Sequence, residues 1–160
     1  MATSDDLDLG TLDLGTLDLR SVESAEFARI VRDTPARRTA EVMAGPHRRR
    51  VLDELFRRME TLFNPAQAGD RTALVRWRIT GAGGALDTYE TYIADGRCVV
   101  TPHGTDRPAR LTLTMAAPEL LRLASGNASG PALFLTRKLK MQGDLRLAGG
   151  LLSYFDIPRA

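Results

Sequence analysis

The sequence predicts an α+β domain in which one five-stranded twisted sheet is covered on one face by helices. Five segments alternate apolar and polar residues with a period of two, which is typical of half-buried strands. Several others carry apolar residues three and four positions apart, as on one face of an amphipathic helix. Because a sheet with one apolar face and helices with one apolar stripe bury these surfaces together, the two patterns favour a layered domain.

Length and composition bound the class of protein. The chain has 160 residues, enough for one domain with a substantial core, and no apolar run approaches the roughly 18 residues that span a bilayer. The start is acidic, without the basic segment and apolar core of a secretory signal, and Cys98 is the one cysteine. We therefore expect a cytoplasmic protein. The excess of arginine over lysine, 20 to 2, is typical of a GC-rich actinobacterial source.

Residues 1–22 contain a five-residue repeat, LDLGT. Its period matches neither a helix nor a strand, so we expect a mobile acidic tail. Pairing as an edge strand and binding of its leucines in the domain's own apolar opening are the alternatives. The first twenty residues carry a charge of −4, so the remainder must carry +6 to give the net charge of +2. That excess predicts weak contact with anionic membrane surfaces.

Two short helices are predicted in residues 23–45, an N-terminal helical extension of the main domain, residues 46–160. The main domain opens with a long amphipathic helix over 46–63, whose apolar stripe has helical spacing. The same helix carries arginines at 48–50 and 57–58, without the interleaved aromatics typical of nucleic-acid sites. We expect this basic face to be solvated, with weak contact to anionic lipid as the alternative, and no nucleic-acid partner.

Four strands are predicted in the middle of the chain, over 74–80, 86–93, 97–101 and 108–115. The pair Asp95-Gly96 predicts a tight hairpin turn between the second and third strands. The glycine-rich connection before the second strand lacks the strand-to-helix context of a phosphate loop, so no nucleotide site is expected.

The C-terminal segment begins with a fifth strand over 138–142, which Gly143 ends because glycine turns the backbone at little steric cost. Asp144 then caps a helix from Leu145. Gly149-Gly150 interrupts that helix, and we expect close packing of helix against strand there. The alternative is a helix kept loose to move aside for a ligand.

Three segments in order carry a likeness to a known family: residues 111–115, residues 120–130 and the run FLTRKLKMQGDL at 134–145. Together they resemble the sterol carrier protein type-two family, whose K-L-K-φ-x-G core is matched at 138–143. The chain departs from the family at Arg137, where glycine is usual, and at Gly149-Gly150, where the last helix usually continues unbroken. The resemblance covers about residues 46–157. It implies the same fold with an apolar tunnel between the sheet and the helices.

No residue pattern predicts catalysis, a metal or a cofactor. His47 and His103 lie in no nucleophile or base motif, and with Cys98 they are too few and too far apart for a metal site. Cys98, between valines and an arginine, is expected to be a small buried apolar residue. We therefore expect a protein that is not an enzyme.

The resemblance implies binding and transfer of apolar ligands, namely fatty acids, acyl-CoA, sterols or other lipids. Burial contributes about 0.8 kcal/mol per methylene, so a dry tunnel can hold a fatty chain without polar contacts. The residues expected to line it are large apolar side chains of the long helix, the strands and the C-terminal segment: Phe56, Met59, Phe63, Trp77, Ile79, Leu113, Leu120, Leu121, Phe134, Leu135, Met141, Leu147 and Leu151.

Two other functions remain open from the sequence. One is a non-transporting interaction module with a filled core, which docks on a lipid-metabolising enzyme. The other is nucleic-acid binding through the arginines, which a steep salt dependence would reveal. An apolar cavity of several hundred Å³ would favour the lipid carrier, because ligand sites commonly measure about 300–1,000 Å³.

Overall fold

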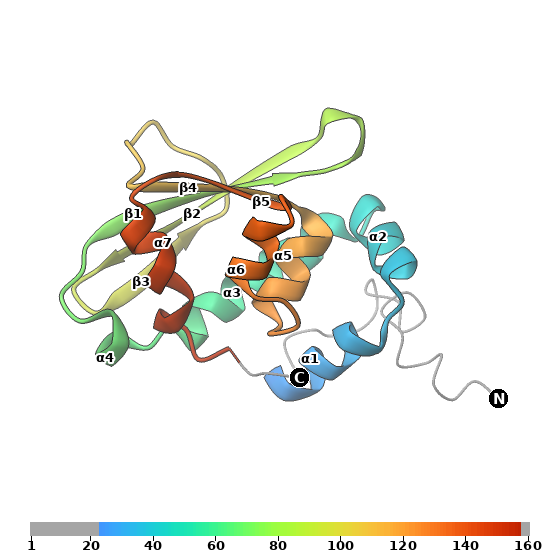
Figure 1. Cartoon of the computed structure of the whole chain (residues 1–160), viewed down its shortest axis with the longest axis horizontal. Coiled ribbons are helices and arrows are strands. Elements are labelled where there is room, and N and C mark those ends of the chain that lie inside the picture. The colour runs from blue at the N-terminus through green and yellow to red at the C-terminus, as the bar shows by residue number, and fades with distance from the viewer. Residues whose placement is uncertain (1–22, 158–160) are drawn as a thin grey trace.

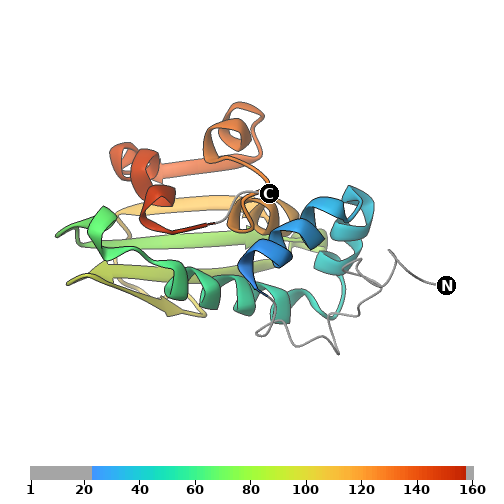
Figure 2. The same cartoon turned by 90° about the horizontal axis from the view of Figure 1, so that it is seen from below.

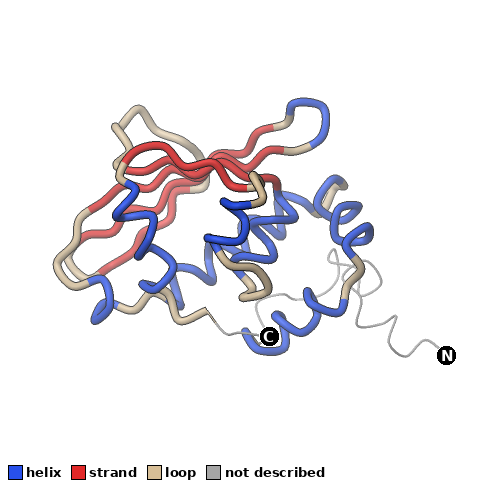
Figure 3. The backbone as a smooth tube through the Cα atoms, in the orientation of Figure 1, coloured by secondary structure: helices blue, strands red, loops and turns tan. Residues whose placement is uncertain are grey.

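The computed structural model describes residues 23–157, which form one five-stranded sheet with helices against a single face (Figure 1). The strands lie in the order β3-β2-β1-β4-β5. Their bounds are β1 Ala73–Thr80, β2 Leu86–Ala94, β3 Arg97–Thr101, β4 Leu111–Ala116 and β5 Leu139–Gly143. All five predicted strands are present, and the predicted α+β class is confirmed (Figure 3).

The sheet is mixed, with one parallel pair at its centre. β1 pairs antiparallel with β2 and parallel with β4, while β5 pairs antiparallel with β4 and forms one edge. The predicted turn joins β2 to β3, and both of its residues have positive φ, 53° at Asp95 and 72° at Gly96. Val75, Trp77 and Ile79 of the central strand are fully buried toward the helices, as the alternation predicted.

The helices form one layer on one face of the sheet, which lies below the sheet in Figure 1 and in front of it in Figure 2. In chain order they are α1 Ser24–Asp33, α2 Ala36–Ala44, α3 Arg48–Leu62, α4 Pro65–Ala68, α5 Ala117–Ala124, α6 Gly130–Leu135 and α7 Leu145–Leu151. Short 3-10 turns follow at Ala82–Gly84 and Leu152–Tyr154. α3 presents its apolar stripe to the sheet, whereas α6 and α7 cover the part of the sheet that ends in β5.

The two N-terminal helices pack on the main body through the same core. Phe27 and Ile30 of α1 and Met43 of α2 belong to the cluster of buried side chains that includes the sheet residues. The Asn127 amide, after α5, donates to the backbone oxygen of Ala28 at 3.0 Å. The LDLGT repeat lies outside the described residues, so the predictions for it are untested.

The expected solvated basic face of α3 is wrong at two arginines. Arg48 is 13% exposed, pairs with Asp87 at 2.8 Å and donates to the backbone oxygen of Ile79 at 3.0 Å. Arg58 is 10% exposed, pairs with Glu54 at 3.0 Å and stacks on Phe27 at 4.7 Å. Burial lowers the pKa of Arg58, while the charge of Glu54 acts against this shift. These long side chains cover apolar surface with their stems and satisfy their charges locally.

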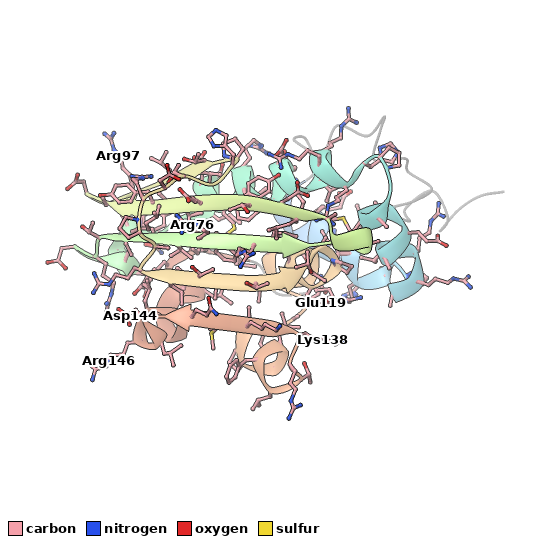
Figure 4. The ribbon with its side chains drawn as sticks, turned by 90° about the horizontal axis from the view of Figure 1, so that it is seen from above. Arg76, Arg97, Glu119, Lys138, Asp144 and Arg146 are labelled. Carbon is pink, nitrogen blue, oxygen red and sulfur yellow. The ribbon has the colours of Figure 1, made fainter. Side chains whose placement is uncertain are left out.

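A fully buried carboxylate fixes the long loop between β3 and β4. Glu90 accepts hydrogen bonds from the Arg76 guanidinium at 2.8 Å and from the backbone amide and hydroxyl of Thr105 at 2.9 and 2.7 Å. Burial alone would raise the pKa of Glu90, but these hydrogen bonds and the Arg76 charge outweigh it and lower the pKa. Figure 4 shows Arg76 on the face of the sheet away from the helices.

Candidate functional site

An apolar cavity of about 310 Å³ lies between α6, α7 and the β4–β5 edge of the sheet. Every described residue that lines it is apolar or glycine: Leu113, Leu123, Gly130, Pro131, Phe134, Leu139, Met141, Leu145, Ala148, Gly149, Leu151 and Leu152. Its volume falls at the lower end of the range for small-molecule sites. The cavity can therefore hold part of an aliphatic chain.

A second cavity of about 540 Å³ adjoins the first, because the two share Leu123, Gly130, Pro131 and Leu152. It is more polar, since Asn127, Ser129 and Ser153 contribute to its walls. The Ser129 hydroxyl oxygen accepts from the amide of Ala132, and the Ser153 hydroxyl donates to the oxygen of Gly150 at 2.6 Å. Among residues 23–157, no charged side chain lines either cavity.

The sequence-predicted lining residues fall into three groups. Leu113, Phe134, Met141 and Leu151 line the 310 Å³ cavity. Leu135 is 79% exposed on the surface beside it, and Phe63 is partly buried against Phe155 with ring centroids 5.6 Å apart. The others are buried in the core away from this cavity: Phe56, Met59, Trp77, Ile79, Leu120, Leu121 and Leu147.

Aromatic packing fills the space between α3 and the sheet. Phe56 stacks on Tyr89 with ring centroids 4.2 Å apart and meets Trp77 edge-on at 5.6 Å. All three rings are fully buried. The Tyr89 hydroxyl donates to Asp53 at 2.5 Å, and burial followed by this bond raises the tyrosine pKa. These three rings are therefore closely packed against one another, whereas an apolar cavity lies under α6 and α7.

Sequence reasoning missed several residues of the cavity, including Leu139 and Leu145. The missed side of α7 has a readable signal, because Leu145, Ala148 and Leu152 are spaced by three and four residues. From this helix the sequence prediction took Leu147 and Leu151 as lining residues, and Leu147 packs into the core instead. Periodicity identified an apolar helix but did not separate the face that meets the cavity.

The expectation of close helix–strand packing at Gly149-Gly150 is wrong. A Cβ atom at Gly149 would meet nothing within 4 Å, and the residue lines the cavity. At Gly150 the nearest neighbour would be the Tyr154 hydroxyl at 3.4 Å, which lies in the following turn and not on a strand. The absence of side chains here keeps space open on the α7 wall.

Gly143 ends β5 as predicted. Its φ is 114°, and a Cβ atom there would collide with the backbone oxygen of Arg110. The Asp144 carboxylate then accepts from the amides of Arg146 and Leu147 at 3.0 and 3.1 Å, which confirms it as the cap of α7. These hydrogen bonds fix the start of the helix that forms one wall of the cavity.

Reactive groups lie away from the cavity. Cys98 is buried on β3, and burial followed by the charge of Glu60 raises its pKa to about 12, so it stays a neutral thiol. Within residues 23–157, no three His, Cys, Asp or Glu side chains converge in a way that could hold a metal ion. In the same part of the chain, no helix has the length and apolar character needed to cross a membrane.

Solved structures with the same fold include two insect proteins and part of a bacterial enzyme. Palmitated SCP2L2 from Aedes aegypti matches with a TM-score of 0.56 at 14% identity, over 68% of this chain and 96% of that one. The sterol carrier protein domain 2 of Helicoverpa armigera matches with a TM-score of 0.56 at 20% identity, over 68% and 87%. The sec-alkyl sulfatase PisA1 of Pseudomonas sp., as a double mutant, matches with a TM-score of 0.57 at 15% identity, over 65% of this chain.

The chain spans only 16% of the length of that sulfatase, so the likeness concerns one part of a larger protein. No curated protein sequence matches the chain. The model of the SCP-2 sterol transfer family matches residues 54–156, which include all five strands and α4 to α7. This match covers more than half of the sequence and agrees with the observed fold. The chain therefore belongs to the SCP-2 sterol transfer family.

Proposed function

We propose that the chain binds one apolar lipid, with its aliphatic part in the 310 Å³ cavity between α6 and α7, and releases it to an acceptor. The cavity with its wholly apolar walls carries this proposal. About ten buried methylenes contribute about 8 kcal/mol, which corresponds to a micromolar dissociation constant before the costs of ordering. Membership of the SCP-2 sterol transfer family supports lipid binding in general.

The ligand class follows from the chemistry of the walls. Because no charged side chain in the described part of the chain lines either cavity, burial of a carboxylate or phosphate there would leave that charge without a partner, at a large cost. The charged end of a fatty acid or acyl-CoA would therefore stay in solvent. A sterol or other lipid with a neutral head group is compatible with both cavities. The solved Aedes aegypti relative is described as palmitated, which makes palmitate a suitable first probe.

Native mass spectrometry of the purified chain, followed by organic extraction, tests the proposal directly. A bound lipid of defined mass, displaced by added palmitate, is the expected result. A ligand-free mass together with no saturable uptake of fluorescent fatty acid or sterol would overturn it. A weakly bound ligand can be lost in the gas phase, and the uptake of fluorescent fatty acid or sterol, measured in solution, controls for this loss.

A second candidate is a module that docks on a lipid-metabolising enzyme without transport. One observation favours it: the same fold forms part of a sec-alkyl sulfatase, where the match covers 16% of that chain. This role predicts no lipid uptake and requires no catalytic group in the module itself. In either role we propose that residues 46–160 act in the cytoplasm, that 23–45 extend the domain, and that the chain itself catalyses no reaction.

A further inference from the structure

β5 forms one edge of the sheet, and its two faces differ in chemistry. It is the last strand in the sheet order, so the backbone groups along its outer side have no neighbouring strand among residues 23–157. Leu139 and Met141 face the helices and line the cavity. Lys138, Lys140 and Gln142 alternate with them and are exposed on the opposite face. A chain that pairs with this edge would therefore meet an apolar side and a cationic side at once.

The apolar side of the β5 edge is open to solvent. Figure 2 shows α6 and α7 at opposite ends of β5, and the cavity lies between these two helices. Phe134 of α6 is 49% exposed and Leu145 of α7 is 61% exposed, and both side chains line the cavity. Because exposed side chains form its walls, the cavity opens to the surface at this edge of the sheet.

The cationic side of the β5 edge has no acidic counterpart within the described residues. Lys138 and Lys140 form no salt bridge with any of them. The β4 residue opposite Lys140 is the neutral Thr114. Asp144, the nearest acidic residue along the chain, already accepts from Arg110 at 3.2 Å and from two amides of α7. This side of the edge therefore favours an acidic segment.

The repeat in residues 7–19 has the complementary chemistry. Each repeat contains the tripeptide L-D-L, at residues 7–9, 12–14 and 17–19, which we call the LDL units. In an extended chain the two leucines of a unit lie on one face and the aspartate on the other. Pairing with β5 can therefore place the leucines at the cavity opening and the aspartate beside the lysines. The opposite register would place the aspartate at the apolar opening, so one register is strongly favoured.

The five-residue period suits pairing of one short unit and not of the whole segment. Five is odd, so successive repeats of an extended chain would turn their leucines to opposite faces. One LDL unit therefore matches β5 at a time. Three equivalent units on one tether raise the chance that the edge is occupied, because each competes for it at a high local concentration.

The chain between the LDL units and the described residues is long enough for this contact. Residues 10–22, which are 13 residues, separate the first unit from Glu23. Extended at about 3.3 Å per residue, they span about 40 Å. A domain of this size has a radius of gyration of about 14 Å. The first unit can therefore reach across the domain to the β5 edge.

We propose that one LDL unit pairs with the free edge of β5 and covers the opening of the cavity with its leucines. The contact is intramolecular, and a lipid that enters the cavity displaces it. The competition between lipid and LDL unit rests on the proposed lipid-binding function, whereas the docking of the unit on β5 does not.

Two other contacts fit the described surface less well. A second copy paired through β5 would bring the lysines of the two copies close together, which is unfavourable. The basic face of α3 attracts an acidic segment, but Arg48 and Arg49 both pair with Asp87, and Arg57 pairs with Glu54. The exposed large apolar side chains of residues 23–157 also lie on other elements than α3. Charge and apolar surface coincide at the β5 edge.

A nitroxide on Thr11→Cys, between two LDL units, tests the docking by NMR in the full chain. Cys98 is buried, so the label attaches to the introduced cysteine. The amide signals of residues 138–142 should broaden, while those of β3 at the opposite edge of the sheet should not. Broadening that is strongest on α3, or absent from residues 23–157, would overturn the proposal. So would equal broadening between a spin-labelled copy and a separate isotope-labelled copy, which would show contact between molecules.

Charge reversal tests which residues meet. Lys138→Glu together with Lys140→Glu should abolish the broadening, because the aspartate of a docked unit then faces like charges. Adding Asp8→Lys, Asp13→Lys and Asp18→Lys to the same chain should restore it. Loss without restoration would contradict the pairing of these aspartates with the β5 lysines.

Two further variants separate the paired register from general attraction between charges. The matched control, Arg37→Glu with Arg97→Glu, changes the net charge equally at exposed arginines elsewhere and should keep the broadening. Figure 4 shows Arg97 far from Lys138 on the sheet. A serine variant, in which serine replaces the leucines of all three LDL units, keeps every charge and should lose the broadening. Broadening that persists in the serine variant, or that disappears in the control, would overturn the paired register.

Palmitate titration of the wild-type chain and the serine variant tests whether the docked unit covers the cavity. A tethered segment with an effective concentration of about 1 mM and a dissociation constant of about 0.5 mM occupies the edge about two-thirds of the time. The serine variant should therefore bind palmitate about threefold more tightly than the wild-type chain. Equal affinity despite a confirmed contact would overturn the cover. Absence of palmitate binding in both chains would overturn the proposed function, while the NMR result would still decide the docking.

Discussion

Gly149 offers the sharpest test of where the lipid lies, because it leaves open space on the α7 wall of the cavity. A Cβ atom at this position would meet no atom within 4 Å, and the exposed Gly149 lines the 310 Å³ space, so we expect a leucine side chain to have room to occupy part of it. It would displace about four methylenes of the ligand, which at about 0.8 kcal/mol each weakens binding by about 3 kcal/mol, or roughly 150-fold. We expect this loss for Gly149→Leu in an isothermal or fluorescence titration with palmitate.

The folded state should not suffer from the same change. Gly149 lies within α7 without a positive φ, and a helix gains up to about 1 kcal/mol when glycine is replaced by a good helix former. The urea midpoint should therefore stay equal or rise. Gly149→Ala is the matched control, with the same gain in helix propensity and a loss of binding below about fivefold. If Gly149→Leu binds palmitate as tightly as the wild-type chain, the ligand does not occupy this cavity.

Three further predictions concern stability and reactivity. Glu90→Gln should lower the free energy of unfolding by about 2–4 kcal/mol in urea titrations, because it removes the buried charge that holds Arg76 and the loop between β3 and β4. Asp33→Asn is the control: its carboxylate belongs to an exposed pair, so the free energy of unfolding should not change measurably. Since the pKa of Glu90 is lowered in the folded state, its contribution to stability is complete above the ordinary glutamate pKa of about 4.3 and is lost as pH falls through the lower folded-state pKa. In that pH range the urea midpoint of the wild-type chain should drop more steeply than that of Glu90→Gln. Arg48→Met should lower the free energy of unfolding by about 1–3 kcal/mol, because the backbone oxygens of Met43 in α2 and Ile79 in β1 lose their donor. An unchanged urea midpoint would contradict that role. Cys98 should react with a thiol reagent only in urea, because its pKa is raised to about 12 and the side chain is buried; rapid reaction of the native chain would show that β3 opens.

Much of the fold could be predicted from the sequence because the patterns that determine it are local. The alternation in β1, the Asp95-Gly96 turn and the stop at Gly143 each depend on residues close together in the chain. The Asp144 cap is of the same kind. In each case the backbone conformation follows from neighbouring side chains and their hydrogen bonds, so the pattern alone was sufficient.

The packing of side chains in the interior could not be predicted in this way. Phe56 and Leu151 are equally apolar and each sits on an amphipathic helix, yet one packs in a solid aromatic cluster and the other lines a cavity. Gly149 was interpreted as a packing glycine although it faces open space. Periodicity states only that a side chain faces inward.

The sequence by itself determined the α+β class, the five strands, the family and the apolar character of the interior. Only the tertiary structure decided that β4 lies parallel to β1, that Arg48 and Arg58 are largely buried, and that an apolar cavity lies under α6 and α7. A cavity is set by how side chains from distant segments fill the volume between them, and that sum of shapes is not encoded in the spacing of any one segment.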